Sequence, residues 1–382
     1  MRVGTPSRTG VALAALSAAC FVSVTSENLP VALLPQLAAG FAVSEPAVGL
    51  LMTGYALVVA ISVVPLVALT VRWDRRTAAL VTVAAVAVSN LLLAAAPGYA
   101  VAVVARLVAA AGHGVFWSVV AAMAARLLGP DRAGRATAVV FAGNSLAFLL
   151  GLPLSSWLGA TIGWRPTVLT VAAAAAVSAV VIRLTVDPMP AGAPAGPHGA
   201  LNRSLWPVNL ATLIVVTGHF AAFTYITAII AEFAHLTGPA TSALLFAHGV
   251  AGLLGLVLIG RGVDARPRAT ALLVTAGLAA CMIVLLVAGS GAVAGAAVVL
   301  WALPAAGIGV VLQAAVLRVA THPDLASAVY IVAFQIGIAA GAGVGGAALG
   351  HGALPLAVTV AAVCGLLATA VVSRSRAFCR TR

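Results

Sequence analysis

The sequence predicts an all-α integral membrane protein with about twelve transmembrane helices in two pseudo-symmetric six-helix bundles. Three observations predict this fold class: the composition, the recurrence of long apolar runs, and the similarity between the two halves of the chain. Of the 382 residues, 63% are hydrophobic and only 7% are charged, whereas soluble globular proteins carry about 25% charged residues. With a mean hydropathy of +1.17, the chain has too few polar residues to cover a surface that faces water, and lipid is its expected solvent.

Apolar runs long enough to cross a bilayer, roughly 17–25 residues each, recur along the whole chain. Polar and apolar residues do not alternate with a period of two, which argues against a membrane β-barrel and leaves helices as the spanning elements. The N-terminus resembles a signal peptide, but its apolar character continues towards Ala39, so we expect a retained first span. The expected spans are 10–36, 47–71, 78–96, 100–127, 136–160, 167–184, 207–231, 241–262, 270–288, 292–317, 326–349 and 354–373.

The arginines predict the orientation of these spans. The chain has no lysine, and 18 of its 20 arginines fall in the termini, in alternate loops or at the span ends that border these loops. Only Arg165 falls in the opposite set of loops, and Arg106 falls well inside a span. The positive-inside rule then predicts a multi-pass protein of the cell membrane with both termini cytoplasmic. The same clusters account for the net charge of +12, so we expect no nucleic-acid partner.

The two halves of the chain resemble each other. The stretch "DPMPAGAPAGPHGALNRS" reads as a cytoplasmic linker, because it is rich in Pro, Gly and Ala and weakly charged. It predicts an N-terminal bundle over 1–184, a linker over 185–206 and a C-terminal bundle over 207–382. "WDRRTAALV" lines up with "RPRATALLV", and the glycines of "GNSLAFLLGLP" line up with those of "GIAAGAGVGG". Two parallel repeats place a substrate site near the bilayer midplane, between the halves.

Four stretches carry a resemblance to a known family. They are "SENLPVALLPQLA" in the first expected span, "RLVAAAGHGVFWSVVAAMAARL" in the fourth, "GHFAAFTYI" at the start of the second half and "AFQIGIAAGAGVGG" in the eleventh. They resemble spans of the major facilitator superfamily, and within it the twelve-span drug:proton antiporters of the arabinose-efflux and chloramphenicol-efflux type. The resemblance covers nearly the whole chain. It implies transport of a small solute by alternating access.

The loop after the second span resembles the gate motif of this superfamily, with departures. The usual pattern is Gly-x-x-x-Asp-Arg-x-Gly-Arg-Arg, and the loop here reads "VALTVRWDRR", with Asp74 where a glycine is usual. The second-half copy, "GRGVDARPR", keeps Gly260 and Asp264. These charges are either gate contacts or simply loop charges that follow the positive-inside rule. The gate candidates are Asp74, Arg75, Arg76, Asp264, Arg266 and Arg268.

Two charged residues, Glu27 and Arg106, fall inside expected spans and away from the span ends. A charge at the bilayer centre costs about 2.5–3.5 kcal/mol on insertion scales, so each calls for a reason. At about 1.5 Å per residue, both lie roughly 9–14 Å below the outer ends of their spans. The similar depth predicts a pair. The pair is either an element of proton coupling or a static structural contact; in a third alternative, Glu27 reaches out to the outer interface.

Three histidines also fall inside expected spans. His113 and His219 lie near mid-membrane, and His248 lies nearer the outer end of its span. Imidazole titrates near physiological pH, so each is a candidate proton relay, although a buried histidine more often has a purely structural role. The proton-coupling candidates are Glu27, Arg106, His113 and His219.

Aromatic and amide side chains are the candidates for a substrate cavity. Aromatic rings can stack on an amphipathic substrate, and an amide inside lipid requires a partner. The alternatives are packing or an interfacial belt for the rings and helix–helix hydrogen bonds for the amides. The candidates are Tyr55, Phe116, Trp117, Asn144, Phe223, Tyr225, Trp301 and Gln335.

The function predicted from these patterns is secondary active transport, most simply proton-coupled export of a small organic compound such as a drug, an antibiotic or a sugar-like metabolite. A phosphate-binding loop of the Gly-x-x-x-x-Gly-Lys type requires a lysine, so an ion gradient is the expected energy source. A facilitator or importer of a sugar-like solute is the alternative. We expect no enzymatic activity, no cofactor and no metal site, because buried acids and histidines are few and the four cysteines are scattered. We expect the monomer to be functional.

Overall fold

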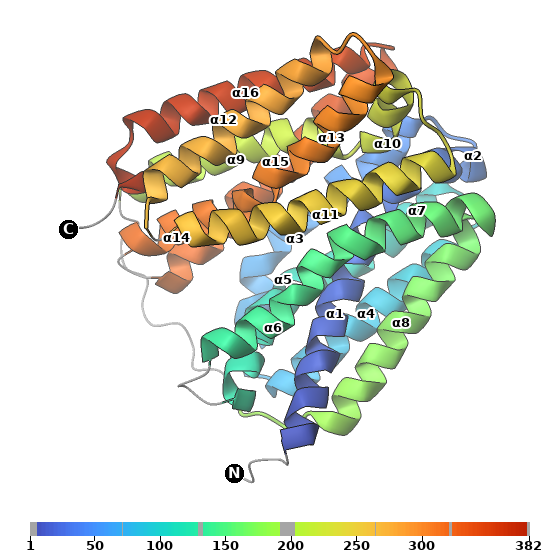
Figure 1. Ribbon diagram of the computed structural model, residues 1–382. Coiled ribbons are helices and arrows are strands. Elements are labelled where there is room, and N and C mark those ends of the chain that lie inside the picture. The colour runs from blue at the N-terminus through green and yellow to red at the C-terminus, as the bar shows by residue number, and fades with distance from the viewer. Residues whose placement is uncertain are drawn as a thin grey trace. The chain divides into compact units, whose positions relative to one another are not determined.

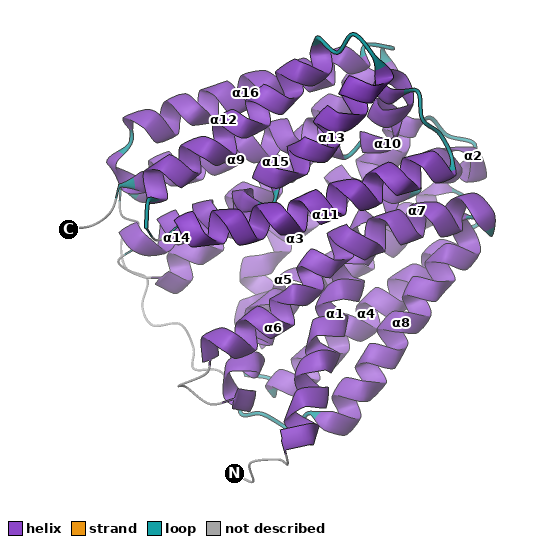
Figure 2. Cartoon of the chain, viewed as in Figure 1, coloured by secondary structure: helices purple, strands orange, loops and turns teal. Residues whose placement is uncertain are grey.

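The protein is described by a computed structural model, which covers residues 6–70, 72–128, 133–191, 203–263, 265–320 and 323–379. Within these ranges the chain consists of helices joined by loops and turns, and no strand occurs (Figure 2). Eleven helices of this part are long and apolar enough to cross a membrane. The predicted all-α membrane fold is confirmed.

The contacts within the chain group it into two compact units. The first unit comprises Met1–Leu29 and Ile61–Pro194, and the second comprises Pro30–Ala60 and Ala195–Arg382. The boundaries between them fall inside two helices, α1 (Pro6–Ala32) and α3 (Glu45–Thr70). The division at a central linker, expected from the sequence, stays a prediction.

In the first unit α4 packs against both α5 and α8, and α5 also packs against α6 (Figure 1). The carboxylate of Asp74 accepts a hydrogen bond of 3.0 Å from the main-chain N–H of Thr77 and so caps the start of α4. The other helices of this unit are α4 (Arg75–Ala95), α5 (Tyr99–Leu128), α6 (Ala133–Leu146), α7 (Leu152–Thr161) and α8 (Trp164–Thr185).

In the second unit α9 packs against α15 and α16, while α13 packs against α11 and α12 (Figure 1). Several of these helices begin with a proline in their first turn, where the missing N–H has no intrahelical partner to lose. The helices are α2 (Leu34–Phe41), α9 (Leu205–Phe223), α10 (Ile226–Ile229), α11 (Pro239–Gly262), α12 (Pro267–Leu286), α13 (Gly291–Ala305), α14 (Gly307–Val319), α15 (Pro323–Gly350) and α16 (Leu354–Arg374), with short turns η3 (Ile230–Ala234) and η4 (Arg376–Phe378).

Prolines lie at the divisions of three predicted spans. The span expected over 10–36 is divided between α1 and α2, with Pro35 in the first turn of α2. The span expected over 136–160 is not one helix but α6, a single wider π-helical turn η2 (Ala147–Gly151) and α7, with Pro153 in the first turn of α7. The span expected over 292–317 bends near Pro304, between α13 and α14. Proline lacks an N–H and clashes with the preceding turn. The sequence therefore stays apolar across these points, although the pattern of helical hydrogen bonds is interrupted.

The exposure of side chains is inverted relative to a soluble protein. Large apolar side chains face outwards, as Ile61 (74% exposed) and Leu184 (69% exposed) do, whereas Arg106 is fully buried. Lipid tails are as apolar as leucine, so burial of such side chains is not what drives helix association in a membrane. The exposed apolar surface therefore fits a lipid environment, and a buried arginine requires a specific partner.

The internal repeat is visible as a helix contact that occurs once in each unit. Gly151 lies so close to α1 that an added Cβ would meet the side chain of Thr25, and Gly345 on α15 lies equally close to the main chain of α9 at Ala221. The two glycines are 194 positions apart and their partners are 196 apart. The stretch Ala102–Val115 of α5 likewise matches Ala297–Val310, at an offset of 195, and this match pairs Arg106 with Trp301.

Candidate functional site

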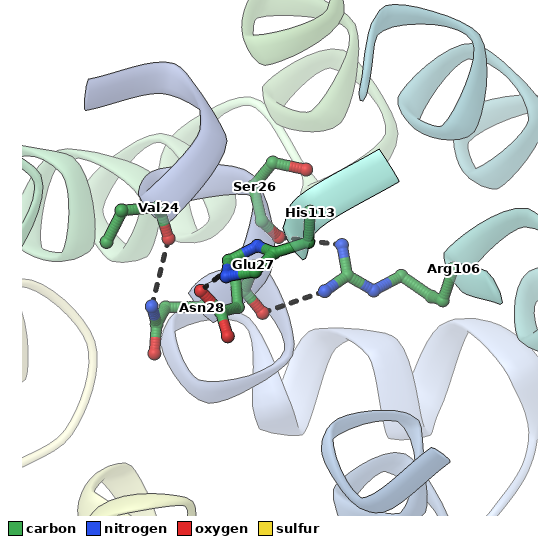
Figure 3. A network of polar contacts seen from close by, with 6 residues as sticks. All are labelled: Val24, Ser26, Glu27, Asn28, Arg106 and His113. Carbon is green, nitrogen blue, oxygen red and sulfur yellow. Dashed lines mark hydrogen bonds and ion pairs between the residues drawn. The ribbon is translucent and has the colours of Figure 1, made fainter. Parts of the chain in front are cut away.

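Arg106 of α5 is completely buried and holds the main chain of α1. Its Nη1 donates to the carbonyl oxygen of Ser26 at 2.7 Å, and its Nη2 donates to that of Glu27 at 2.8 Å (Figure 3). A planar guanidinium presents N–H groups in a fixed fork, which suits two neighbouring oxygens. These hydrogen bonds run to the main chain at Glu27, whereas the sequence prediction placed the contact at its carboxylate.

Pro30 explains why a donor is required at this point of α1. A proline inside a helix cannot donate to the carbonyl group four residues earlier, and that carbonyl belongs to Ser26. In the bilayer no water replaces the missing N–H, and an unsatisfied carbonyl costs several kcal/mol. Arg106 supplies the donor. It therefore has a structural role that does not depend on proton transfer.

The Glu27 carboxylate faces His113, which lies on the same side of α5 as Arg106. Oε2 of Glu27 is 3.9 Å from Nδ1 of His113, and the two side chains are only 12% and 10% exposed (Figure 3). Arg106 and His113 are seven residues, or two helical turns, apart, which puts them on one helix face. Two groups whose charge depends on protonation thus lie beside an arginine whose charge does not.

The helix α4 braces the same turn of α1 through Asn90, a residue that the sequence prediction missed. The Asn90 Nδ2 group donates to the Ser26 hydroxyl at 2.7 Å and to the carbonyl oxygen of Val86 at 2.8 Å, and its side chain is completely buried. One signal was present in the sequence, because Asn90 is an amide in the middle of an apolar run. Its partner could not be inferred without the packing of α4 on α1 and α5.

A second cluster lies in the second unit, where α9, α11 and α13 contribute one ring or more each. Trp301 is fully buried, and its Nε1 donates to Nδ1 of His219 at 3.2 Å. Nδ1 of His248 lies 2.7 Å from the carbonyl oxygen of Val298. An indole nitrogen only donates and a carbonyl oxygen only accepts. The partners therefore assign the protons: His219 is protonated on Nε2, and His248 is protonated on Nδ1.

Phe223 completes this cluster. Its ring stacks on His219 with 5.1 Å between centroids, and it lies edge-on to Trp301 at 6.2 Å. We refer to His219, Phe220, Phe223, His248 and Trp301 as the ring cluster. Of the cavity candidates, Phe223 and Trp301 are brought together here, with the proton-coupling candidate His219.

The other cavity candidates of the second unit are also buried. Tyr55 is almost fully buried. The Tyr225 hydroxyl donates to the carbonyl oxygen of Ala342 at 2.9 Å, so this ring fastens the end of α9 to α15. Gln335 is 5% exposed, and its Oε1 accepts no hydrogen bond from the described residues.

In the first unit the remaining cavity candidates lie on α5 and α6. Phe116 is buried, and its ring lies edge-on to half-buried Trp117 with 5.6 Å between centroids. Trp117 also lies 6.0 Å from the His113 ring. Asn144 is half-buried on α6. The structure therefore places one aromatic pair next to the Glu27–His113 contact.

The gate candidates of the first unit make local contacts. Asp74 caps α4, the main-chain N–H of Arg75 donates to Met189, and Arg76 donates to the carbonyl oxygen of Val186 at 3.2 Å. These contacts fasten the chain after α8 to the start of α4.

In the second unit Arg266 precedes α12, and Arg268 lies 3.7 Å from the sulfur of Cys379. Asp264 lies outside the described residues. A gating role for all six candidates stays a prediction.

Within the described ranges, no group of three or more His, Cys, Asp or Glu side chains is arranged to hold a metal ion. The four cysteines are free thiols.

Comparison with known proteins gives a family and two kinds of relative. The family model of the Major Facilitator Superfamily matches residues 16–342. The chain is 38% identical over 354 residues to a chloramphenicol efflux pump of Mycobacterium tuberculosis. The aligned region covers 89% of this chain and 86% of that protein. It is 30% identical over 333 residues to a Helicobacter pylori protein named "Probable sugar efflux transporter", with 85% of each covered.

Solved structures with the same fold cover nearly the whole chain. A bacterial homologue of the human lysosomal transporter Spinster, in an inward-facing and occupied conformation, matches 97% of this chain and 98% of its own, with a TM-score of 0.78 and 15% identity. The human organic anion transporter MFSD10 matches 97% of this chain and 100% of its own, with a TM-score of 0.72 and 16% identity. At these identities the likeness is one of fold.

Proposed function

Because the chain belongs to the Major Facilitator Superfamily, we propose that this membrane transporter exports a small organic compound in exchange for protons. The observation that carries the proposal is the contact between Glu27 and His113 beside Arg106. Burial favours the neutral form of a carboxyl group, and a nearby cation favours its anion. A carboxylate in this position therefore responds to changes in hydration and in neighbouring charge.

The coupling step that we propose takes place between α1 and α5. A proton that arrives from outside neutralises Glu27 and weakens its attraction to His113, and loss of the proton restores that attraction. A contact with two states that a proton can bias is what coupling requires. Arg106 keeps its two carbonyl partners in both states, because its charge does not change. It acts as a positioning residue that holds α1 against α5 while the neighbouring contact changes.

The substrate class that we propose is a small amphipathic compound of the kind that the mycobacterial relative's name specifies. Identity of 38% over most of both chains supports a related substrate. The aromatic pair Phe116–Trp117 offers rings on which such a compound can stack. The Helicobacter relative favours a sugar-like solute as the second candidate.

Transport by the Glu27→Gln variant tests the proposal. The variant is expected to lose pH-driven, uphill export in proteoliposomes and to keep downhill exchange, because glutamine has nearly the same shape but cannot release a proton. A panel of compounds, beginning with chloramphenicol, is first screened by resistance in a sensitive host to select the substrate.

Glu232→Gln is the matched control, because it removes an exposed carboxylate from η3. If Glu27→Gln still drives uphill transport of the substrate at the wild-type rate, Glu27 is not the coupling group. His113 would then be the next residue to substitute.

We also propose that the protein lies in the cell membrane, acts as a monomer and has both termini in the cytoplasm, as the arginine distribution predicts. A cysteine introduced by Gly196→Cys in the linker should resist an impermeant thiol reagent in intact cells. Gly289→Cys, between α12 and α13, lies in an open position and should be labelled. Labelling of the first variant and protection of the second would invert the orientation.

A further inference from the structure

We propose that His219 is a second proton-binding site, and that a proton bound to its Nδ1 releases Trp301 from α9. The inference rests on the proposed proton-driven export for its purpose, but its test requires only the purified protein. It gives the second unit a contact that responds to protons, in addition to the Glu27–His113 contact of the first.

The argument begins with the hydrogen bond between the two side chains. The Trp301 Nε1–H group donates to Nδ1 of His219 at 3.2 Å. The lone pair on Nδ1 is the only means by which His219 can accept this bond. A proton taken from the aqueous phase binds to that lone pair, after which both ring nitrogens are donors. No other bond forms or breaks, and the indole N–H loses its acceptor.

His248 provides the contrast within the same cluster. Its Nδ1–H group donates to the carbonyl oxygen of Val298 at 2.7 Å. A proton that binds to His248 would be added at Nε2 and would leave this hydrogen bond intact. The two histidines thus have opposite hydrogen-bond polarity, and only the His219 contact is incompatible with an imidazolium ion.

The position of Trp301 gives its release a mechanical consequence. Trp301 lies three residues before Pro304, near which the span bends between α13 and α14. Pro304 cannot donate to the carbonyl oxygen of Leu300, so the helix is weakest at this turn. The contact with His219 fastens α13 to α9 beside that bend. Loss of the contact frees the helix where it bends most easily.

Among the described residues, the ring cluster contains one titratable ring besides His219. Trp301 of α13 does not titrate, and His248 of α11 lies against Trp301 and Phe223 in the same cluster. Cys364 of α16 contacts the neighbouring residue Gly218. The other charged or titratable side chains described on helices that contact α9 are Tyr330 of α15, Arg374 of α16, Arg318 of α14 and Arg376 of η4. None of these four belongs to the ring cluster.

The environment of Trp301 at different pH values tests the proposal. The protein is labelled with 5-fluorotryptophan, and the fluorine resonance of Trp301 is identified by its loss in Trp301→Phe. If that variant does not fold, the resonance is identified by elimination with phenylalanine variants at the other five of the six tryptophans. Spectra are recorded between about pH 8 and about pH 5, the range in which imidazole groups ordinarily titrate.

Two asparagine variants provide matched comparisons. His219→Asn keeps a side-chain oxygen acceptor near the position of Nδ1 that does not bind a proton in this range, so its Trp301 resonance should not move. His248→Asn keeps a donor towards Val298, and its Trp301 resonance should move as in the wild type. A resonance that is static in the wild type, or that still moves in His219→Asn, would overturn the proposal.

The Glu27→Gln variant separates this inference from the proposed function. Its Trp301 resonance should respond to pH as in the wild type, because Glu27 belongs to the other unit. If Glu27→Gln abolishes driven export while the wild-type resonance is static, the proposed function stands and the His219 site is wrong. The opposite result would leave a proton-sensitive His219 in a transporter that is not driven through Glu27.

Discussion

The two units carry different chemistry at matching positions. In the first unit, Arg106 of α5 holds α1 by two hydrogen bonds to carbonyl groups. In the second, Trp301 occupies the corresponding position and holds α9 by one hydrogen bond to His219. The first contact is fixed, because neither an arginine nor a carbonyl group titrates. The second is lost when its acceptor gains a proton.

The comparison also shows what the arginine is for. The offset of 196 that relates Thr25 of α1 to Ala221 of α9 pairs Pro30 with Ile226. An isoleucine has the main-chain N–H that a proline lacks. At the corresponding position in the second half of the sequence, no proline therefore leaves a carbonyl group without its helical donor. The half of the sequence that has the proline also has the arginine, and the half without the proline has a tryptophan. Repair of the main chain therefore gives Arg106 a role that does not require an ion pair.

The largest effect should come from removing both hydrogen bonds of the first unit. Arg106→Ala leaves two buried carbonyl groups without this donor, at about 1–3 kcal/mol each. Trp301→Phe removes one neutral hydrogen bond, worth about 0.5–1.5 kcal/mol. Thermal unfolding in detergent should therefore place Arg106→Ala well below Trp301→Phe. Equal midpoints would contradict the difference drawn between the two units.

A double-variant cycle isolates the role of the proline. Pro30→Ala restores an N–H for the Ser26 carbonyl, so Arg106→Ala should cost less in that background, by roughly the value of one carbonyl contact. If the cost of Arg106→Ala is the same in both backgrounds, the arginine does not compensate for the proline.

The repeated glycine contact should show the next largest effect. An added methyl at Gly345 meets the main-chain carbonyl of Ala221, which cannot move without moving α9. At Gly151 it meets the side chain of Thr25, whose hydroxyl forms no hydrogen bond within the described part and can rotate. Overpacking costs about 1–3 kcal/mol. Gly345→Ala should therefore lower the unfolding temperature more than Gly151→Ala, and the reverse order would refute this explanation.

The smallest effect should come from the residues that precede α4 and α12. Asp74→Ala removes a cap from α4 and should cost about 1 kcal/mol, whereas Asp74→Asn keeps an acceptor for Thr77 and should cost little. Arg266→Ala at the start of α12 removes no side-chain cap and should be near neutral. Unfolding midpoints measure all three. A transport defect in Asp74→Asn, with normal stability, would instead support the gate.

Much of the fold could be predicted from the sequence, because a spanning helix requires only a long apolar run. The spans expected over 136–160 and 292–317 are exceptions, since hydropathy does not register the interruption of a helix at η2 and Pro153 or near Pro304. The grouping of Pro30–Ala60 with the second unit could not be predicted either. It depends on contacts such as that of Thr53 with the carbonyl oxygen of Ala339, 286 residues away.

The candidate site could be predicted in part. The depth of each residue in its span placed Glu27 and Arg106 at the same level, but it could not show that the arginine donates to two carbonyl groups of α1. The role of His113 depends on its position two turns from Arg106, which places it against α1 only once α1 and α5 pack together. The protonation pattern of His219 and His248 depends on the partner of each nitrogen, and those partners come from distant parts of the sequence.

The dependence of Arg106 on Pro30 constrains the order in which substitutions can accumulate. A proline gained without the arginine leaves a carbonyl group bare in lipid, and an arginine gained without the proline buries a charge that has lost one of its acceptors to the helix. Each single change is unfavourable and the two together are tolerated, which is reciprocal sign epistasis. Related sequences should therefore carry both residues or neither, and a half that loses one should rapidly lose or regain the other.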